Sequence, residues 1–152
     1  MSAAIASTVL DGETAVRAAV GRDLGVTDWF DITGQRLADF VAATGDHDGA
    51  FFALSLSNMF LPQIVEVRGF ALGVNYGTQA VRLGTPLRAG DRVRGRATLV
   101  DVAEVRAGIQ TTMVITVETE TGRETESGVD PEACVIESLS RWMNPIEPGG
   151  TT

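Results

Sequence analysis

Apolar residues between positions 33 and 45 recur at the spacing of an amphipathic helix. Leu37, Phe40 and Val41 fall on one helical face. Thr33, just before them, has a side chain that caps helix starts, and Gly45 is of the residue type that most often ends a helix. The pattern therefore predicts a helix between Thr33 and Gly45.

A second helix is predicted immediately afterwards, from residue 51 to residue 61. Nearly every position in this stretch is apolar, and only Ser55, Ser57 and Asn58 interrupt it. A helix that is hydrophobic on most sides is typical of a protein core. We expect Pro62 to stop this helix, because proline cannot continue the helical hydrogen bonding.

After Pro62 the period of the pattern changes to two, which is typical of strands. Apolar or β-branched residues alternate with polar ones, and glycine-containing turns separate the segments. Upstream, GETAVRAAVGRDLG predicts a short first helix, and a brief strand is expected around Trp29 to Ile32. The strands after Pro62 are expected in IVEVRGFALGVNYG, QAVRLG, DRVRGRATLVDVAEV, GIQTTMVITVETETG and ACVIESLSRWM.

One buried helix ahead of a long antiparallel meander predicts an α+β fold in which the sheet wraps around the helix. With 152 residues and 44% hydrophobic content, the chain suits one compact domain better than two.

Charge and composition exclude several classes of function. The formal net charge of -8 argues against nucleic acid as a partner, since its binding needs clustered basic residues. No stretch approaches the roughly 18 consecutive apolar residues of a membrane span. All 12 cationic residues are arginines, which excludes a Schiff-base or P-loop lysine.

Cysteine and histidine usage sets further limits. The single cysteine, Cys134, cannot form an internal disulfide, and the N-terminus shows no secretion signal, so we expect a cytoplasmic protein. One cysteine and one histidine cannot build a zinc site, and the sequence points to no metal and no cofactor.

Four segments resemble, in order, the MaoC-like (R)-specific enoyl-thioester hydratases and dehydratases. They are GRDLGVTDWFDITGQRLADFVAATGDHD, FFALSLSNMFLPQI, GFALGVNYGTQAVRLGTPLRAGDRVRGRATLVDV and ACVIESLSRWM. The most specific parts are the paired TGDH and LSL segments and the Asn75-Tyr76-Gly77 stretch.

The resemblance implies a hotdog fold, in which a long antiparallel sheet wraps a buried central helix. It covers residues 21–143, which we take as a single domain between an N-terminal segment (1–20) and a flexible C-terminal tail (144–152). It also implies a homodimer that acts on acyl thioesters, or on related small hydrophobic ligands, with the acyl group carried by coenzyme A or acyl carrier protein.

The chemistry of the resembled family uses an Asp-x-x-x-x-His motif. This pair activates a water that adds to the β-carbon of a double bond while a proton goes to the α-carbon. A backbone N–H at the start of the buried helix polarises the thioester carbonyl. Asp46 matches the aspartate, but Phe51 stands five residues later and no histidine follows it. The pair is therefore incomplete in this sequence.

A family segment that contains the catalytic histidine, an overhanging loop and a His-Gly pair is also missing. Asp48-Gly49-Ala50 stand in its place. Two explanations remain open: the chain has lost the hydratase site, or the sequence omits a mobile loop.

His47, the only histidine, is the candidate substitute partner of Asp46. As the direct neighbour of Asp46 it would point about 100° away around a helix axis, so the two side chains do not easily converge on one water. The competing interpretation is a solvated turn of Asp46, His47 and Asp48, with His47 near the C-terminus of the preceding helix.

Other residues are candidates for binding or reactivity. Cys134 is interpreted as a small core residue, since no histidine or cationic cluster accompanies it. Four arginines follow each other closely in the sequence: Arg88, Arg92, Arg94 and Arg96. We interpret them as a solvent face of the sheet rather than as a site for a coenzyme A phosphate. The candidate substrate-binding residues are Phe51, Asn75, Tyr76 and Gly77, although a Tyr-Gly pair beside a buried helix also fits close packing.

Three hypotheses of function follow. The chain is a hydratase or dehydratase with an impaired or remodelled site, a hotdog protein that binds an acyl or polyketide-like ligand and steers a cyclisation, or a non-catalytic subunit of an active paralogue. An open apolar cavity beside Asp46 would favour the second hypothesis, and a collapsed one the third.

Overall fold

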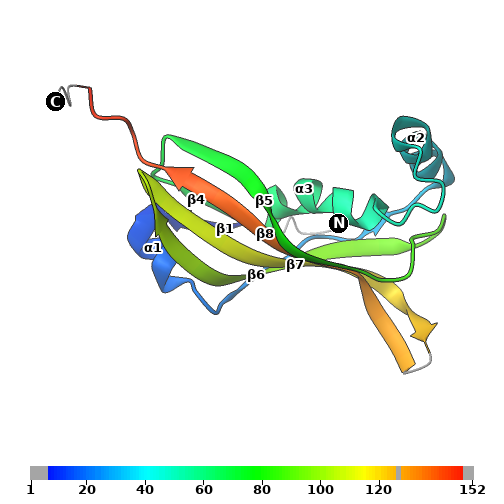
Figure 1. Ribbon diagram of the computed structural model, residues 1–152. Coiled ribbons are helices and arrows are strands. Elements are labelled where there is room, and N and C mark those ends of the chain that lie inside the picture. The colour runs from blue at the N-terminus through cyan, green and yellow to red at the C-terminus, as the bar shows by residue number, and fades with distance from the viewer. Residues whose placement is uncertain (1–6, 126–127, 149–152) are drawn as a thin grey trace.

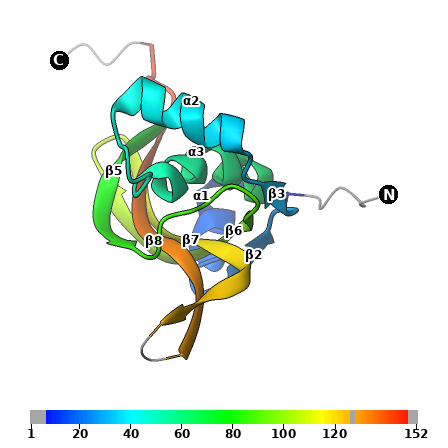
Figure 2. The ribbon, with the colours of Figure 1, turned by 90° about the vertical axis from the view of Figure 1, so that its right-hand side faces the viewer.

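The computed structural model describes residues 7–125 and 128–148. A long curved sheet dominates the molecule, and helix α3 lies along one of its faces (Figures 1 and 2). In chain order the elements are β1 (Thr8–Asp11), α1 (Gly12–Ala18), β2 (Asp23–Val26), β3 (Phe30–Asp31), α2 (Gly34–Thr44), α3 (Phe52–Ile64), β4 (Val65–Arg68), β5 (Leu72–Leu83), β6 (Arg92–Val105), β7 (Gly108–Thr125) and β8 (Gly128–Met143).

The main sheet is antiparallel and has the strand order β2-β6-β7-β8-β5, with β3 paired to the start of β6. Every second residue of β7 from Ile109 to Thr119 is buried, as a period of two requires. The predicted antiparallel sheet is confirmed. Among the described residues, strand β5 pairs only with β8 and therefore forms one edge of this sheet.

Two features of the sheet differ from the predicted meander. Strand β4 lies outside the main sheet and pairs in parallel with β1, a strand too short to give a periodic signal. Strand β5 is one element of 12 residues, whereas the sequence predicted a break after Gly77. Register shifts at Asn75/Gly77 and Thr78/Ala80 keep the strand paired with β8, because bulges absorb the extra residues.

The ends of α2 follow the predicted capping residues. The Thr33 hydroxyl accepts a hydrogen bond from the backbone N–H of Arg36 at 3.2 Å. Gly45 has a φ of 72°, the left-handed conformation that favours glycine at a helix end. The predicted helix between these residues is confirmed.

The predicted end of α3 at Pro62 is wrong. The helix continues through Pro62 to Ile64, and the extended backbone of Val65 ends it. Proline is tolerated there because it lies in the last turn, where one missing N–H removes little of the hydrogen-bond ladder.

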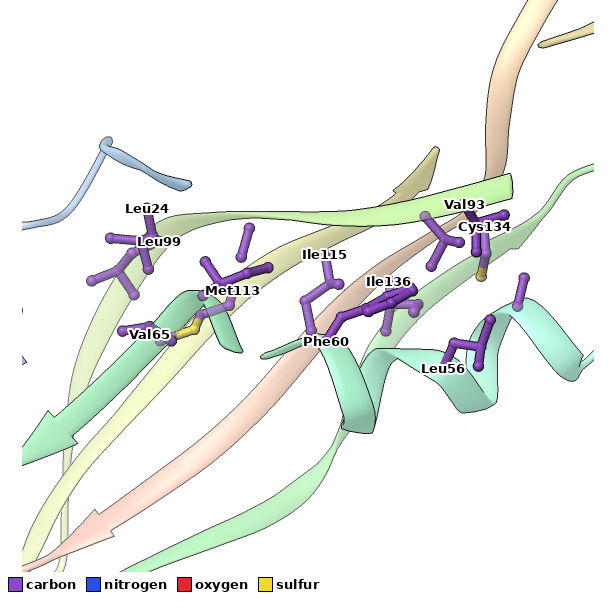
Figure 3. Packing of buried hydrophobic residues seen from close by; sticks show 14 of the residues in the cluster. Leu24, Leu56, Phe60, Val65, Val93, Leu99, Met113, Ile115, Cys134 and Ile136 are labelled. Atoms are coloured by element: carbon purple, nitrogen blue, oxygen red, sulfur yellow. The ribbon is translucent and has the colours of Figure 1, made fainter. Parts of the chain in front are cut away.

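One face of α3 packs tightly on the sheet. Figure 3 shows Phe60 beside Ile115 and Ile136, and Phe60 is only 1% exposed. Gly95 of β6 permits this approach, since a Cβ added there would lie 2.6 Å from the Cβ of Phe60. Burial of the helix is only partial, however, because Phe51 at its start is 53% exposed and Leu54 is half-buried.

The N-terminal segment belongs to the same core, since Leu10, Val16 and Ala19 are buried in it. Residues 144–148 of the predicted tail form neither helix nor strand, and residues 149–152 lie outside the described residues. In the described part of the chain, no helix combines the length and the apolar character that crossing a membrane requires.

Candidate functional site

A tight turn of residues 45–51 connects α2 to α3. The backbone N–H of Gly49 donates to the carbonyl of Asp46 at 3.1 Å, and the N–H of Phe51 donates to Oδ2 of Asp46 at 2.9 Å. The backbone N–H of Asp46 is itself held by the Thr44 hydroxyl at 3.1 Å. Asp46 thus caps the start of α3, where the helix dipole favours a negative charge.

His47 is exposed beside this turn. Its backbone N–H donates to the carbonyl of Gly45 at 3.0 Å, and within residues 7–125 and 128–148 its side chain has no hydrogen bond or ion pair. The structure does not join His47 to the Asp46 carboxylate. The catalytic roles assigned to these two residues remain predictions.

Three of the candidate substrate-binding residues are consecutive on β5, but their surroundings differ. The amide of Asn75 donates to the amide oxygen of Asn58 on α3 at 3.2 Å. The ring of Tyr76 instead lies 3.6 Å from the guanidinium carbon of Arg141, and is 54% exposed. Gly77 is half-buried, with no atom within 4 Å of the position that a Cβ would take, and Phe51 lies in the turn before α3. Of the four residues, Asn75 alone lines the cavity described next.

A cavity of about 430 Å³, here called the α3 cavity, lies between the second face of α3 and strands β5 and β8. A neighbouring cavity of about 330 Å³ shares four of its lining residues, Leu61, Pro62, Ser140 and Trp142. The α3 cavity is open along β5, whose residues are mostly exposed. Its lining is Leu54, Ser55, Ser57, Asn58, Leu61, Pro62, Gly73, Val74, Asn75, Thr78, Ile115, Ile136, Ser138, Ser140 and Trp142.

Sequence reasoning missed most of this lining. Ser138 and Ser140 stand in phase with Cys134 and Ile136 in the alternation of β8, so they face the core side of the sheet. Two serines at inward positions of a long strand are the signal that would have indicated a polar cavity there.

The arginines of β6 at positions 92, 94 and 96 alternate with its buried residues and so point to the face of the sheet away from α3. Glu118 accepts hydrogen bonds from Arg94 at 2.9 Å and from Arg96 at 3.0 Å. Burial alone would raise the pKa of Glu118, but the bonds from both guanidinium groups outweigh it and leave this pKa below its usual value. Arg92 pairs with Asp31 and Glu120. Arg92, Arg94 and Arg96 therefore already have carboxylate partners, as expected for a solvent face.

Nucleophilic and metal chemistry find little support in the described residues. Burial raises the pKa of the Cys134 thiol to about 11, so this side chain is protonated at neutral pH. Within the described ranges, no three His, Cys, Asp or Glu side chains are grouped so that they would hold a metal ion.

Comparison with known proteins places this architecture. No family model matches the chain. The 3-hydroxyacyl-thioester dehydratase Z of Mycobacterium tuberculosis (strain ATCC 25618 / H37Rv) is 33% identical over 146 residues, which cover 83% of this chain and 92% of that protein.

Two solved structures share the fold at low sequence identity. The unliganded R-hydratase PhaJ1 of Pseudomonas aeruginosa has a TM-score of 0.58 at 14% identity, covering 88% of this chain and 89% of its own. The MaoC-like dehydratase of Rhodospirillum rubrum has a TM-score of 0.56 at 12% identity, covering 84% and 95%. With the antiparallel sheet around α3, these similarities show that the chain belongs to the MaoC-like hydratase and dehydratase family of the hotdog fold.

Proposed function

We propose that this chain binds an acyl thioester in the α3 cavity and catalyses hydration or dehydration far more weakly than a family member with a complete Asp-x-x-x-x-His pair. The hydrogen bond from the Phe51 N–H to Asp46 carries the proposal. It engages the carboxylate of the predicted catalytic aspartate, and Phe51 itself stands where the motif would have its histidine. The name of the dehydratase Z relative, which specifies 3-hydroxyacyl thioesters, supports the ligand class.

The residues near Asp46 supply only part of the required chemistry. Adding water to an enoyl thioester needs one group that takes a proton from water and one that delivers a proton to the α-carbon. Asp46 offers a carboxylate, but the phenyl ring of Phe51 can neither accept nor deliver a proton. Loss of one member of a general acid–base pair costs about 10²–10⁴-fold in rate.

The start of α3 is also less suited to polarise a thioester carbonyl. The N–H of Phe51 is bonded to Oδ2 of Asp46. A developing enolate oxygen at this N–H would compete with a carboxylate and be repelled by its charge. We therefore expect the turn to act as a structural cap rather than as an oxyanion hole.

The α3 cavity favours ligand binding over a purely structural role. Its volume of about 430 Å³ falls within the range of roughly 300–1,000 Å³ typical of ligand pockets. Asp46, His47 and Phe51 are not among its lining residues. We therefore take the acyl chain to contact α3 and β8 inside this cavity, while the thioester extends beyond the lining residues toward Asp46 at the start of α3.

A homodimer formed along β5 is part of the proposal. The outer edge of β5 is free of a neighbouring strand among the described residues. Arg82 is the only charged residue of this strand. Its exposed large apolar side chains are Leu72, Val74, Tyr76, Val81 and Leu83. A long apolar edge with little charge favours pairing with another chain, and a second copy supplies a matching strand.

A cytoplasmic location also belongs to the proposal. The buried free thiol of Cys134 is compatible with a reducing compartment, where unpaired cysteines are the rule.

Hydration of crotonyl-coenzyme A, followed by loss of the enoyl absorbance, tests the proposed activity. We expect a turnover below about 10⁻² per second, against roughly 1–10³ per second for typical enzymes. Phe51→His restores the motif spacing and should raise this turnover at least about tenfold. Phe51→Ala is the matched control and should give no gain.

Turnover of the unaltered chain in the range of typical enzymes, abolished by Asp46→Asn, would contradict the impaired site.

For the dimer, sedimentation velocity at micromolar concentration should show two copies. Val81→Lys should weaken this association, whereas Val100→Lys on β6 should leave it unchanged. A monomeric parent protein would disprove the homodimer.

A further inference from the structure

Two serine hydroxyls face the α3 cavity from the same strand. Ser138 and Ser140 of β8 are each only 8% exposed, and both line the cavity. Because side chains two residues apart share one face of a strand, the two hydroxyls follow each other along the cavity floor at about 6.5–7 Å.

Neither hydroxyl has a protein partner in the part of the chain that the structure describes. At Ser140 only the backbone is engaged, since its carbonyl accepts a hydrogen bond from the Thr111 hydroxyl within the described residues. No fully buried side-chain nitrogen or oxygen in the described residues lacks a partner, so these hydroxyls are open to the cavity rather than sealed in the core. A hydroxyl in such a place gains most from a partner supplied by the ligand.

The neighbouring strand β5 adds further uncharged polar groups beside the two serines. Thr78 lies across from Ser138 in the β5–β8 pairing, and Asn75 lies across from Ser140. The Asn75–Asn58 hydrogen bond uses only one donor and one acceptor of these two amides, so each retains further bonding capacity. Polar groups therefore follow the cavity along both strands.

The rest of the lining favours a neutral acyl group with an apolar framework in the cavity. No charged side chain is among the residues that line the α3 cavity within the described ranges. Leu54, Leu61, Ile115, Ile136 and Trp142 supply apolar walls between the polar groups. A plain hydrocarbon chain would fit these walls but would leave both serine hydroxyls without partners.

We infer that the cavity selects acyl chains that carry hydroxyl or keto oxygens beyond the β-carbon, as polyketide-type chains do, over saturated fatty acyl chains. The inference rests on the proposed function, because it takes the acyl group to lie in the α3 cavity. A site built to hydrogen-bond a ligand oxygen discriminates against the analogue that lacks it, since the polar groups of the site are then left unpaired.

Trp142 provides the readout, since its indole lines the cavity. A Trp29→Phe background leaves Trp142 as the only tryptophan of the chain. Its fluorescence is titrated with three N-acetylcysteamine thioesters of equal chain length: decanoyl, 7-hydroxydecanoyl and 7-oxodecanoyl. We expect the two oxygenated chains to bind about tenfold more tightly than decanoyl.

Removal of the hydroxyls should abolish this preference. Ser138→Ala/Ser140→Ala should bring the three affinities within about twofold of one another, because the lost bonds were made only to the oxygenated chains. The matched control is Thr112→Val/Thr116→Val, which removes two hydroxyls from the other face of the sheet and should keep the preference. The single variants Ser138→Ala and Ser140→Ala serve if the double variant does not fold.

The outcomes separate this inference from the proposed function. Equal affinity of the parent background for all three thioesters overturns the oxygen preference while leaving acyl binding intact. A preference that persists without both hydroxyls also overturns it. If none of the three thioesters binds, the proposed function is overturned as well.

Discussion

The two faces of helix α3 meet the same sheet in opposite ways. On one face, Phe60 packs against Gly95 of β6, and a Cβ at Gly95 would lie 2.6 Å from it. The other face borders the α3 cavity, which is also lined by residues of β5 and β8. Glycine occurs there too, but a Cβ at Gly73 would meet the Trp142 ring at 2.5 Å rather than the helix.

The comparison shows that glycine in a strand has two different uses in this fold. At Gly95 the missing side chain lets the helix backbone approach the sheet, which closes the core. At Gly73 it makes room for an indole that forms a wall of the cavity. The packed face should therefore resist added atoms, whereas the open face should accept them.

The largest expected effect is that of Gly95→Ala. The added methyl would overlap the Cβ and Cγ of Phe60, which cannot move without shifting α3, so we expect a loss of about 1–3 kcal/mol in unfolding free energy. Gly77→Ala is the matched control on β5, since no atom lies within 4 Å of its added Cβ and its φ is not positive. Urea unfolding at pH 7 compares the two variants, and equal stabilities would remove the distinction between the faces.

The open face is tested by filling it. Leu54→Trp adds volume inside the α3 cavity, so we expect at least a tenfold loss of decanoyl-thioester affinity, or about 1.4 kcal/mol, with unfolding free energy changed by less than about 1 kcal/mol. Isothermal titration calorimetry measures the affinity. Met59→Trp, at an exposed position of α3 outside the cavity, is the control. Unchanged binding in Leu54→Trp would place the ligand elsewhere.

The sequence predicted the packed half of this comparison better than the open half. Alternation along β6 and β7 and the caps Thr33 and Gly45 are local signals, and the structure follows them. The apolar run of α3 indicated a helix correctly. It gave no sign that one face would border a cavity, because hydrophobicity does not distinguish a residue in a dry core from one that lines an open pocket.

The order in which the strands pair could not be predicted for a different reason. Pairing of β1 with β4 and of β5 with β8 joins segments that are distant in sequence, and alternation within a strand does not specify its neighbour. The candidate site was limited in the same way. The Asp46–Phe51 bond follows from how the short turn folds, which residue types alone do not reveal.

Substitutions on the outer face of β6, away from α3, should change the unfolding free energy less than those on the packed face. The lowered pKa of Glu118 means that its ion pairs stabilise the fold above the unfolded pKa of about 4.3, and that this contribution is lost as pH falls through the folded pKa. We expect Glu118→Gln to cost about 1 kcal/mol at pH 7 and much less at pH 3. Glu120→Gln, at a more exposed ion pair, should cost less at pH 7. A Glu118→Gln deficit that is equal at both pH values would contradict this account.

Asp46 lies in the turn before α3, outside both faces of the helix, and its substitution should have the smallest effect on stability. Asp46→Ala removes the carboxylate that caps the N–H of Phe51, and loss of such a cap costs about 0.5–1 kcal/mol. Asp46→Asn keeps an acceptor oxygen and should cost less than Asp46→Ala. Asp48→Ala is the control, because Asp48 is exposed and makes no hydrogen bond or ion pair through its side chain in the described ranges. Urea unfolding distinguishes the three. If Asp46→Ala were as stable as Asp48→Ala, the carboxylate would have no capping role and would be free for proton transfer, which would reopen the turn as a catalytic site.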